Sequence, residues 1–494
     1  MSRGLLEIRD AVRSGALTVA DSIADAIRQI RKVDPELHAA SQVFETEALE
    51  RASEIDRSIA AGKDPGPLAG VAFTVKENIC TRIGLTTAGS RILESYRAPY
   101  DATVVDRLER AGAVCVAKTN MDEFGMGSST ENSAFGPTRN PWKTTHVPGG
   151  SSGGAAALAA ATRGMIHLGS DTGGSIRQPA SYCGVTGIKP SYGRVSRYGL
   201  LAFASSLDQI GSLQGSAREC AAALSVLAGR DPMDSTSLDR EVPDYLAETK
   251  LGARGLRIGV PREYFPEGID PAVRQRVLEA IDVLRKLGAT VKDVSLPHTR
   301  YANPTYVLIS GAEASSNLAR YDGVHYGYRA EKHGSIVDLY ARSRVEGFGP
   351  EVKRRVMVGT FVLSAGYHEA FYNGACRVRK LIRRDFETVF QEVDAVVCPT
   401  SPVTAFPIGD KIDDPLKLYA VDVLTVPANL ASVPGASFPC GATSEGLPVG
   451  IQIYGRPFED GTVLRLGAAF QDATEHHLAA PPVRAWEPAA GRKG

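Results

Sequence analysis

The chain has 494 residues, of which 43% are hydrophobic and 23% charged, a composition typical of a globular protein with a large buried core. Basic and acidic residues balance at 56 each, so no overall field favours nucleic acid, a membrane surface or an acidic substrate. The seven cysteines are scattered without a CxxC pair, which argues against a zinc site and against a disulfide framework. We find no signal peptide and no apolar run of the roughly 20 residues that span a membrane. We therefore expect a cytoplasmic protein that binds no metal.

The first part of the chain is predicted to be helical. The segment LTVADSIADAIRQIRKV carries apolar residues at helical spacing, and Thr18 precedes it as a candidate N-cap. A second, strongly charged helix is expected over roughly 44–60, before the prolines and glycines of GKDPGPLAG end the pattern. Residues 1–65 are thus predicted to form a helical extension packed on the core.

Strands and helices alternate over most of the remaining chain. In VAFTVKEN, Val71, Phe73 and Val75 alternate with smaller or polar residues, which indicates a strand ending near Lys76. The same theme recurs in three later stretches: TVVDRLERAGA with VCVAK, LRIGVP with VRQRVLEAIDVLRKLGA and TVKDVSL, and LIRRDFETVFQEV with DAVVCPT. This alternation predicts an α/β fold over residues 66–480, with a large mixed and mostly parallel sheet sandwiched between helices. Residues 481–494 are expected to form a loose tail.

The stretch GGSSGGAAALAAA, residues 149–161, combines bare backbone with two hydroxyl groups. A phosphate-binding loop is one interpretation, but alanines follow where a P-loop needs Lys and then Ser or Thr. A dinucleotide fingerprint fails as well, because neither the GxGxxG spacing nor a preceding strand is present. Two interpretations remain open from these residues alone: close backbone packing against a neighbouring element, and nucleophilic catalysis.

A second Gly-Gly-Ser unit lies in DTGGS, where glycines permit a tight turn that exposes the hydroxyl of Ser175. The backbone N–H groups of Thr172, Gly173, Gly174 and Ser175 can converge there on a developing oxyanion. The base that would activate the serine is not fixed by the pattern. His146 and His167, which precede the two loops, are two candidates. Lys76 is a third, but it can act as a base only if burial lowers its pKa towards 7. An ordinary lysine at the end of a strand is exposed and stays charged.

The combined motif GGSSGGAAALAAA…GSDTGGSIRQPASYCGVTGIKPSYGRVSRYG resembles the amidase signature family, whose members use a Ser–Ser–Lys triad. Carried over to this chain, the resemblance implies Ser175 as nucleophile, Lys76 as base and Ser151 as the serine between them, with Ser152 as a mere neighbour. The bridging serine of the family follows a cis peptide bond, so we predict a cis Gly150–Ser151 bond. We also expect Asp171 and Arg177, six residues apart, to brace the turn with an ion pair.

Flanking segments extend the resemblance from the N-terminal helices to about residue 470. They include DEFGMGSSTENSAFGPTRNPW, EVKRRVMVGTFVLSAGY and DVLTVPANLASVPG, and they are similar to glutamine-hydrolysing members of the family. Glutamine carries a carboxylate and an ammonium, so its site needs one cation and one anion. The resemblance implies Arg355 and Asp422 in these roles, with Tyr306 as a further pocket residue.

The activity that the resemblance implies is glutaminase chemistry through an acyl-enzyme, within a three-protein tRNA-dependent amidotransferase. The ammonia would pass to a partner protein that binds ATP and Mg²⁺ and most of the tRNA, so no cofactor is expected in this chain. A stand-alone amidase acting on another small amide is the alternative, and the charged pair Arg355 and Asp422 distinguishes the two. A catalytically inert scaffold is disfavoured because Lys76, Ser151 and Ser175 are all present.

Overall fold

The computed structural model describes residues 3–412 and 414–487. In these residues, eleven strands form a single sheet in the order β1-β3-β2-β4-β6-β5-β10-β11-β9-β7-β8. The strands are β1 (Ala40–Val43), β2 (Ala72–Lys76), β3 (Val114–Thr119), β4 (Met165–Asp171), β5 (Thr186–Lys189), β6 (Gln209–Gln214), β7 (Arg257–Pro261), β8 (Thr290–Val294), β9 (Ala395–Pro399), β10 (Gly435–Ala442) and β11 (Pro448–Gly455). The expected α/β class with a large mixed sheet is confirmed.

The expectation of a mostly parallel sheet is wrong for its centre. Strands β3, β2 and β4 are parallel neighbours, as are β9, β7 and β8. Between these two groups, however, β4, β6, β5, β10, β11 and β9 pair antiparallel in succession. The helix-and-strand alternation in the sequence is clearest in the two outer groups, where helical crossovers join parallel strands. The central β10 and β11 are joined by a short turn, which only antiparallel neighbours can use.

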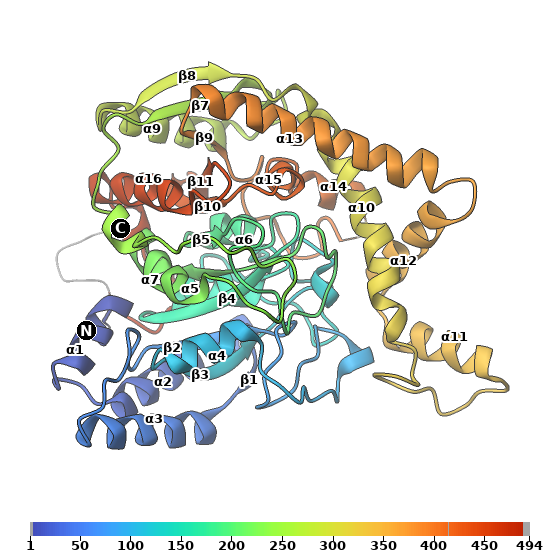
Figure 1. Cartoon of the computed structure of the whole chain (residues 1–494), viewed down its shortest axis with the longest axis horizontal. Helices are drawn as coiled ribbons and strands as arrows, with labels where there is room; N and C mark the ends of the chain where they lie inside the picture. Colours follow the sequence, from blue (N-terminus) through green and yellow to red (C-terminus); the bar gives the residue numbers. More distant parts are fainter. Residues whose placement is uncertain (1–2, 413, 488–494) are drawn as a thin grey trace.

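Helices cover both faces of the sheet (Figure 1). One hydrophobic cluster joins the sheet to α1 (Leu5–Arg13), α4 (Thr103–Arg110), α7 (Ala217–Leu227), α8 (Tyr245–Glu248), α9 (Pro271–Lys286) and α16 (Asp460–Ala473). The clusters on the opposite face include α2 (Val19–Leu37), α3 (Glu45–Ala60), α5 (Gly153–Ala161), α6 (Arg177–Cys183), α13 (Gly374–Glu392) and α15 (Val426–Ala431). Among the described residues, no helix is both long and apolar enough to cross a membrane.

The alternation within β2 decides where Lys76 points. Phe73 and Val75 belong to the cluster that contains α4, whereas Ala72 belongs to the cluster that contains α5. Side chains along a strand alternate between faces, so Lys76 shares the face of Ala72 and lies towards α5. The alanine run and its preceding serines therefore meet the lysine from the same side of the sheet.

The N-terminal segment is more closely integrated than a helical extension. Its two predicted helices occur as α2 and α3, whereas α1 was not predicted. The Thr18 hydroxyl caps α2 by accepting a hydrogen bond from the Asp21 N–H at 3.0 Å. Strand β1, which the sequence pattern does not predict, pairs antiparallel with β3 and extends the sheet by one edge strand. A four-residue strand is too short to show a clear alternation, so its pairing with β3 decides its conformation.

The expected loose tail is wrong for its first residues. Ala485 donates its N–H to Ala161 O at 2.8 Å, at the end of α5, and the buried Trp486 indole lies 3.9 Å from the Arg163 guanidinium. Segment 481–487 is thus docked on the helix that follows the glycine–serine stretch. Residues 488–494 of the expected tail lie outside the described residues.

The remaining helices form a lobe beside the sheet, drawn in yellow and orange in Figure 1. They are α10 (Ala302–Asn317), α11 (Ile336–Gly347) and α12 (Pro350–Leu363), with the short α14 (Pro415–Ala420) nearby. Helix α10 packs against both α12 and α13, which ties the lobe to the sheet. This lobe carries Tyr306 and Arg355, two of the residues that the resemblance assigns to substrate binding.

Close packing of α16 on the sheet yields a first prediction. A Cβ atom on Gly467 would lie 2.0 Å from the ring of Phe438, a fully buried residue of β10. We expect Gly467→Ala to lower the free energy of unfolding by about 1–3 kcal/mol, the usual cost of overpacking a core. Urea unfolding followed by circular dichroism measures the change.

The matched control is Gly374→Ala in α13, where the added Cβ would meet only the Arg377 guanidinium, at 3.9 Å. Alanine is a better helix former than glycine, so this variant should keep or slightly raise the unfolding midpoint. Equal midpoints for both variants would contradict the packing argument.

Candidate active site

Lys76 is a fully buried lysine at the end of β2, not an exposed residue. Burial lowers its pKa to about 7, although the carboxylates of Asp122, Asp171 and Asp208 act in the opposite direction. At neutral pH a substantial fraction of Lys76 is therefore an uncharged amine, the form that can accept a proton. No charged partner lies in direct contact with it among the described residues; its neighbours are hydroxyl and carbonyl oxygens.

Three oxygens surround the Lys76 amine: Ser151 Oγ at 2.8 Å, Ser152 Oγ at 2.7 Å and the Ser170 carbonyl at 3.3 Å. The Ser152 hydroxyl donates its own proton to Ser170 O at 3.0 Å, so towards Lys76 it acts as an acceptor. The Ser170 carbonyl can only accept. Both N–H groups of a neutral amine are thereby used, and its lone pair is left facing the Ser151 hydroxyl. This arrangement suits transfer of a proton from Ser151 to Lys76.

Ser152 is thus more than a neighbour of the site, which corrects the expectation from the sequence. Its hydroxyl holds Lys76, and its backbone N–H donates to Ser175 O at 3.1 Å. The peptide bond between Gly150 and Ser151 is cis, which confirms that prediction.

The glycines of GGSSGG do serve close backbone packing, so that interpretation of the stretch is correct. A Cβ on Gly150 would lie 2.1 Å from Asp122 Oδ2, and one on Gly153 would lie 2.1 Å from Thr130 Oγ1. Side chains at these positions would push away the segment around residues 122–130. The bare backbone therefore brings the two serines close to Lys76.

Ser175 lies in the loop between β4 and α6, and its side chain lines a small cavity. Its hydroxyl makes no hydrogen bond with any described residue. Gly174 adopts φ +143°, and a Cβ there would lie 2.1 Å from Thr425 Oγ1, so both conformation and space require glycine. The loop is held against the segment that contains Thr425.

One of the four expected oxyanion donors is already engaged. The Gly174 N–H donates to Asp171 Oδ1 at 2.9 Å, and the Ile176 N–H donates to Asp171 Oδ2 at 3.1 Å. The Asp171 carboxylate thus already binds the Gly174 N–H, which the sequence analysis assigned to the oxyanion. Thr172, Gly173 and Ser175 remain as candidate donors.

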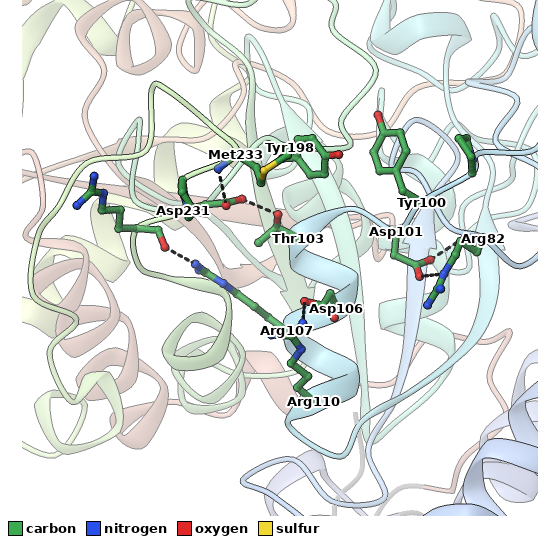
Figure 2. A pocket seen from close by; sticks show the side chains of 13 residues that line it. Arg82, Tyr100, Asp101, Thr103, Asp106, Arg107, Arg110, Tyr198, Asp231 and Met233 are labelled. Atoms are coloured by element: carbon green, nitrogen blue, oxygen red, sulfur yellow. Dashed lines mark hydrogen bonds and ion pairs between the residues drawn. The ribbon is translucent and has the colours of Figure 1, made fainter.

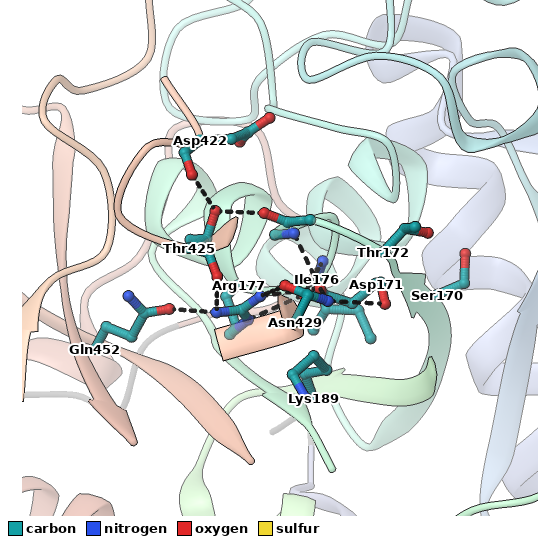
Figure 3. A network of polar contacts seen from close by, with 12 residues as sticks. Ser170, Asp171, Thr172, Ile176, Arg177, Lys189, Asp422, Thr425, Asn429 and Gln452 are labelled. Carbon is teal, nitrogen blue, oxygen red and sulfur yellow. Dashed lines mark hydrogen bonds and ion pairs between the residues drawn. The ribbon is translucent and has the colours of Figure 1, made fainter. Parts of the chain in front are cut away.

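The expected ion pair between Asp171 and Arg177 is confirmed (Figure 3). Both side chains are fully buried, with Arg177 Nη2 3.0 Å from Asp171 Oδ1. Burial alone would raise the pKa of Asp171, but the charge and hydrogen bonds of Arg177 lower it to about 2. The carboxylate stays charged at neutral pH and fixes the turn that carries Ser175.

Both histidines considered as alternative bases lie elsewhere. His167 is buried in β4, where Nδ1 lies 2.9 Å from Thr74 Oγ1, and burial lowers its pKa to about 3. His146 Nδ1 contacts the adjacent Thr145 hydroxyl. Neither is bonded to Ser151 or Ser175.

The cavity beside Ser175 contains all three residues assigned to substrate binding. It is lined by Gly127, Ser128, Gly173, Ser175, Asn303, Tyr306, Val307, Arg355, Tyr419, Asp422 and Val426. The chain therefore gathers four distant segments around one hydroxyl group. A cation and an anion face the same small space, which suits a zwitterionic ligand.

Arg355 projects from α12 and is held by Glu351, one turn earlier, through an Nε–Oε1 contact of 2.7 Å. The Tyr419 hydroxyl donates to the same Oε1 at 2.6 Å. Burial acts to lower the pKa of Arg355, but Tyr419 and Glu351 raise it above its usual value, so the guanidinium is always charged.

Asp422 accepts a hydrogen bond from the Ser128 hydroxyl through Oδ2. Burial raises the pKa of Asp422 to about 7, although that hydrogen bond acts to lower it. The sequence patterns do not single out Ser128, Asn303, Glu351 or Tyr419. Two of them could have been found from their positions. Ser128 lies in the segment DEFGMGSSTENSAFGPTRNPW, which carries part of the resemblance, and Asn303 precedes Tyr306 by three residues on α10.

A second, larger cavity of about 500 Å³ lies over α4 (Figure 2). Its charged groups are already paired within the chain: Arg82 contacts Asp101 at 2.6 Å, and Arg107 donates to the Leu227 carbonyl at 2.7 Å. None of the predicted site residues lines it. Within residues 3–412 and 414–487, no group of three or more His, Cys, Asp and Glu side chains is arranged to hold a metal ion.

The chain belongs to the Amidase family, whose model matches residues 21–464. It is 52% identical to the A subunit of the glutamyl-tRNA(Gln) amidotransferase of Carboxydothermus hydrogenoformans over 475 residues, which cover 96% of this chain and 98% of that protein.

Solved structures agree with the sequence relatives. The A subunit of the glutamyl-tRNA(Gln) amidotransferase of Thermotoga maritima superimposes with a TM-score of 0.78 at 42% identity, covering 95% of this chain and 98% of that one. A bacterial aryl acylamidase of the amidase signature family superimposes with a TM-score of 0.84 at 26% identity, covering 96% of each chain.

The pKa of Lys76 predicts how activity depends on pH. Above about pH 7 the amine is neutral and able to accept a proton, and below it the amine is protonated. Deprotonated Asp422 is favoured over the same range. We expect kcat/KM for amide hydrolysis to rise with pH through about 7 and then to level off. A kcat/KM that stays constant from pH 6 to 8 would contradict both assignments.

The contact between Ser152 and Lys76 predicts a second effect. The Ser152 hydroxyl accepts a hydrogen bond from Lys76, which stabilises the protonated amine more than the neutral one. Ser152→Ala removes this acceptor, so the apparent pKa of the pH profile should fall. The plateau of kcat should drop about tenfold, since one orienting hydrogen bond is lost. Stopped ammonia-release assays across pH measure both quantities. A lower plateau with an unchanged pKa would show that Ser152 does not act through Lys76.

Proposed function

We propose that this chain is the glutamine-hydrolysing subunit of a glutamyl-tRNA(Gln) amidotransferase. The observation that carries the proposal is the single cavity in which Ser175 meets both Arg355 and Asp422, next to the Lys76–Ser151 contact. The names of the full-length relatives support the same function. Arg355 would bind the α-carboxylate of glutamine, Asp422 its α-ammonium, and Tyr306 would form a wall of the pocket.

In the proposed reaction, Lys76 takes the proton of Ser151 while Ser151 takes that of Ser175. Ser175 Oγ then forms a bond with the side-chain amide carbon of glutamine, and the N–H groups of Thr172, Gly173 and Ser175 stabilise the oxyanion. When the C–N bond breaks, the relay returns the proton to the leaving nitrogen, and ammonia departs. Water attacks the resulting ester through the same relay, which releases glutamate and restores Ser175.

The ammonia would pass to a partner in a heterotrimer with the B and C subunits of the amidotransferase. We propose that the partner binds ATP and Mg²⁺, carries most of the tRNA contacts and converts Glu-tRNA(Gln) to Gln-tRNA(Gln) in the cytoplasm. The net charge of zero on this chain suits that division of labour, because tRNA affinity comes mainly from basic residues that neutralise phosphates.

A stand-alone amidase is the second candidate function, favoured by the likeness to the aryl acylamidase. An enzyme for neutral amides gains nothing from burying Arg355 and Asp422 in its pocket, since each charged group costs desolvation energy that no neutral substrate repays. The charged pair therefore favours glutamine as the substrate.

The direct test measures ammonia release from glutamine by the chain co-expressed with its partner subunits. Ser175→Ala removes the proposed nucleophile and should lower kcat by about 10³-fold or more. Ser225→Ala, on the half-buried side of α7, is the matched control and should retain wild-type activity. Full activity of Ser175→Ala would exclude the nucleophile, and hydrolysis of neutral amides without glutamine hydrolysis would favour the second candidate function.

A further inference from the structure

Two residues that line the cavity beside Ser175 each carry a buried oxygen without a hydrogen-bond donor. The two oxygens are Asp422 Oδ1 and Asn303 Oδ1, and neither has a partner among the described residues. Both residues line the same cavity as Arg355 and Ser175. Buried polar atoms are nearly always paired, so two unpaired acceptors in one small space indicate a donor that arrives with a ligand.

A shared contact holds these two residues together. Asn303 Nδ2 donates to the Tyr419 carbonyl at 3.0 Å, and the backbone N–H of Asp422 donates to the same carbonyl at 3.3 Å. The carbonyl accepts only, so it also fixes which end of the Asn303 amide is nitrogen. The amide oxygen is consequently turned away from Tyr419 O, as an acceptor.

The Asp422 carboxylate is oriented in a comparable way. Its Oδ2 atom accepts from the Ser128 hydroxyl, which leaves Oδ1 as the oxygen without a donor. The orientation of each unpaired oxygen, Asn303 Oδ1 and Asp422 Oδ1, is therefore fixed by the hydrogen bond that the other terminal atom of the same side chain makes.

Helix α10 aligns Asn303 with the reacting loop. Asn303 and Tyr306 are three residues apart and lie on the same helical face. The ring of Tyr306 packs so closely on the loop that a Cβ at Gly173 would lie 2.8 Å from it. The face of α10 that carries Asn303 is thus turned towards Ser175 and the cavity.

We propose that Asn303 binds the α-ammonium of glutamine together with Asp422, and that it helps to select amides of α-amino acids. This inference rests on the proposed function. An ammonium group has three N–H donors and no acceptor, which matches two unpaired acceptor oxygens. Arg355, whose guanidinium is held by Glu351, receives the carboxylate of the same substrate. An amide without the α-amino group would leave both oxygens unpaired, and a site is selective when the wrong ligand leaves its buried polar groups without partners.

The experiment compares two substrates in the complex with its partner subunits. One is L-glutamine, and the other is 4-carbamoylbutanoate, which keeps the carboxylate and the amide but lacks the ammonium. Asn303→Leu has a similar volume and no acceptor. We expect this variant to raise KM for glutamine about tenfold or more, because one hydrogen bond to a charged group is lost. Its kcat should stay within about twofold of the wild-type value. KM for 4-carbamoylbutanoate should not change; if turnover is too slow, its inhibition constant against glutamine replaces KM.

Two further variants separate binding from structure. Asn303→Asp keeps an acceptor, so its KM for glutamine should lie closer to the wild-type value than that of Asn303→Leu. Asn317→Leu, on the same helix, removes a similar side-chain contact to a carbonyl, Phe203 O at 3.2 Å, outside the cavity. It should leave KM for both substrates unchanged.

The inference is overturned if Asn303→Leu leaves KM for glutamine unchanged, or if it weakens both substrates equally, as a structural role would. Failure of the proposed function is distinguishable, because then the wild-type complex itself would release no ammonia from glutamine.

Discussion

The buried ion pair between Asp171 and Arg177 is the interaction on which the site depends. Burying a charge is costly unless it is fully hydrogen-bonded, and here all five guanidinium N–H groups have acceptors. Besides Asp171, these are the Thr425 carbonyl and the side chains of Asn429 and Gln452. One side chain of α6 thus joins the end of β4 to the segment of α15 and to β11. The Asp171–Arg177 pair therefore fixes the position of the loop that carries Ser175, the proposed nucleophile, relative to the segment that carries Asp422.

The second constraint is that a buried lysine must stay neutral among carboxylates. Asp122, Asp171 and Asp208 all favour the charged amine, yet burial still lowers its pKa to about 7. The neighbouring carboxylates are engaged elsewhere: Asp171 with Arg177, and Asp122 with the backbone N–H of Thr130 at 2.9 Å. Among the described residues, Lys76 hydrogen-bonds only to hydroxyl and carbonyl oxygens, which the glycines of GGSSGG allow to approach. Small residues and engaged carboxylates together leave Lys76 able to accept a proton, which is the role proposed for it.

Sequence patterns predicted the features that depend on local structure. The Thr18 cap and the alternation in β2 both follow from neighbouring residues. Resemblance to a family supplied Arg355 and Asp422, which no spacing rule would single out. The rest depends on contacts between distant segments: Ser128 and Asp422 are separated by 294 positions, and the direction of the central strands depends on pairing across the sheet. The role of Ser152, whose hydroxyl donates to the Ser170 carbonyl and accepts from Lys76, can be recognised only once the positions of both partners are known.

The two charged side chains of the cavity beside Ser175 differ in how firmly their charge is fixed. Arg355 is paired with Glu351, and its guanidinium is always charged. Burial raises the pKa of Asp422 to about 7, so its carboxyl group is only partly charged near neutral pH. An arriving ammonium favours its charged form, so binding of the zwitterion and loss of a proton are coupled. A neutral amide would provide no such gain, so under the proposed function the protonation of Asp422 would contribute to discrimination against it, together with its contacts.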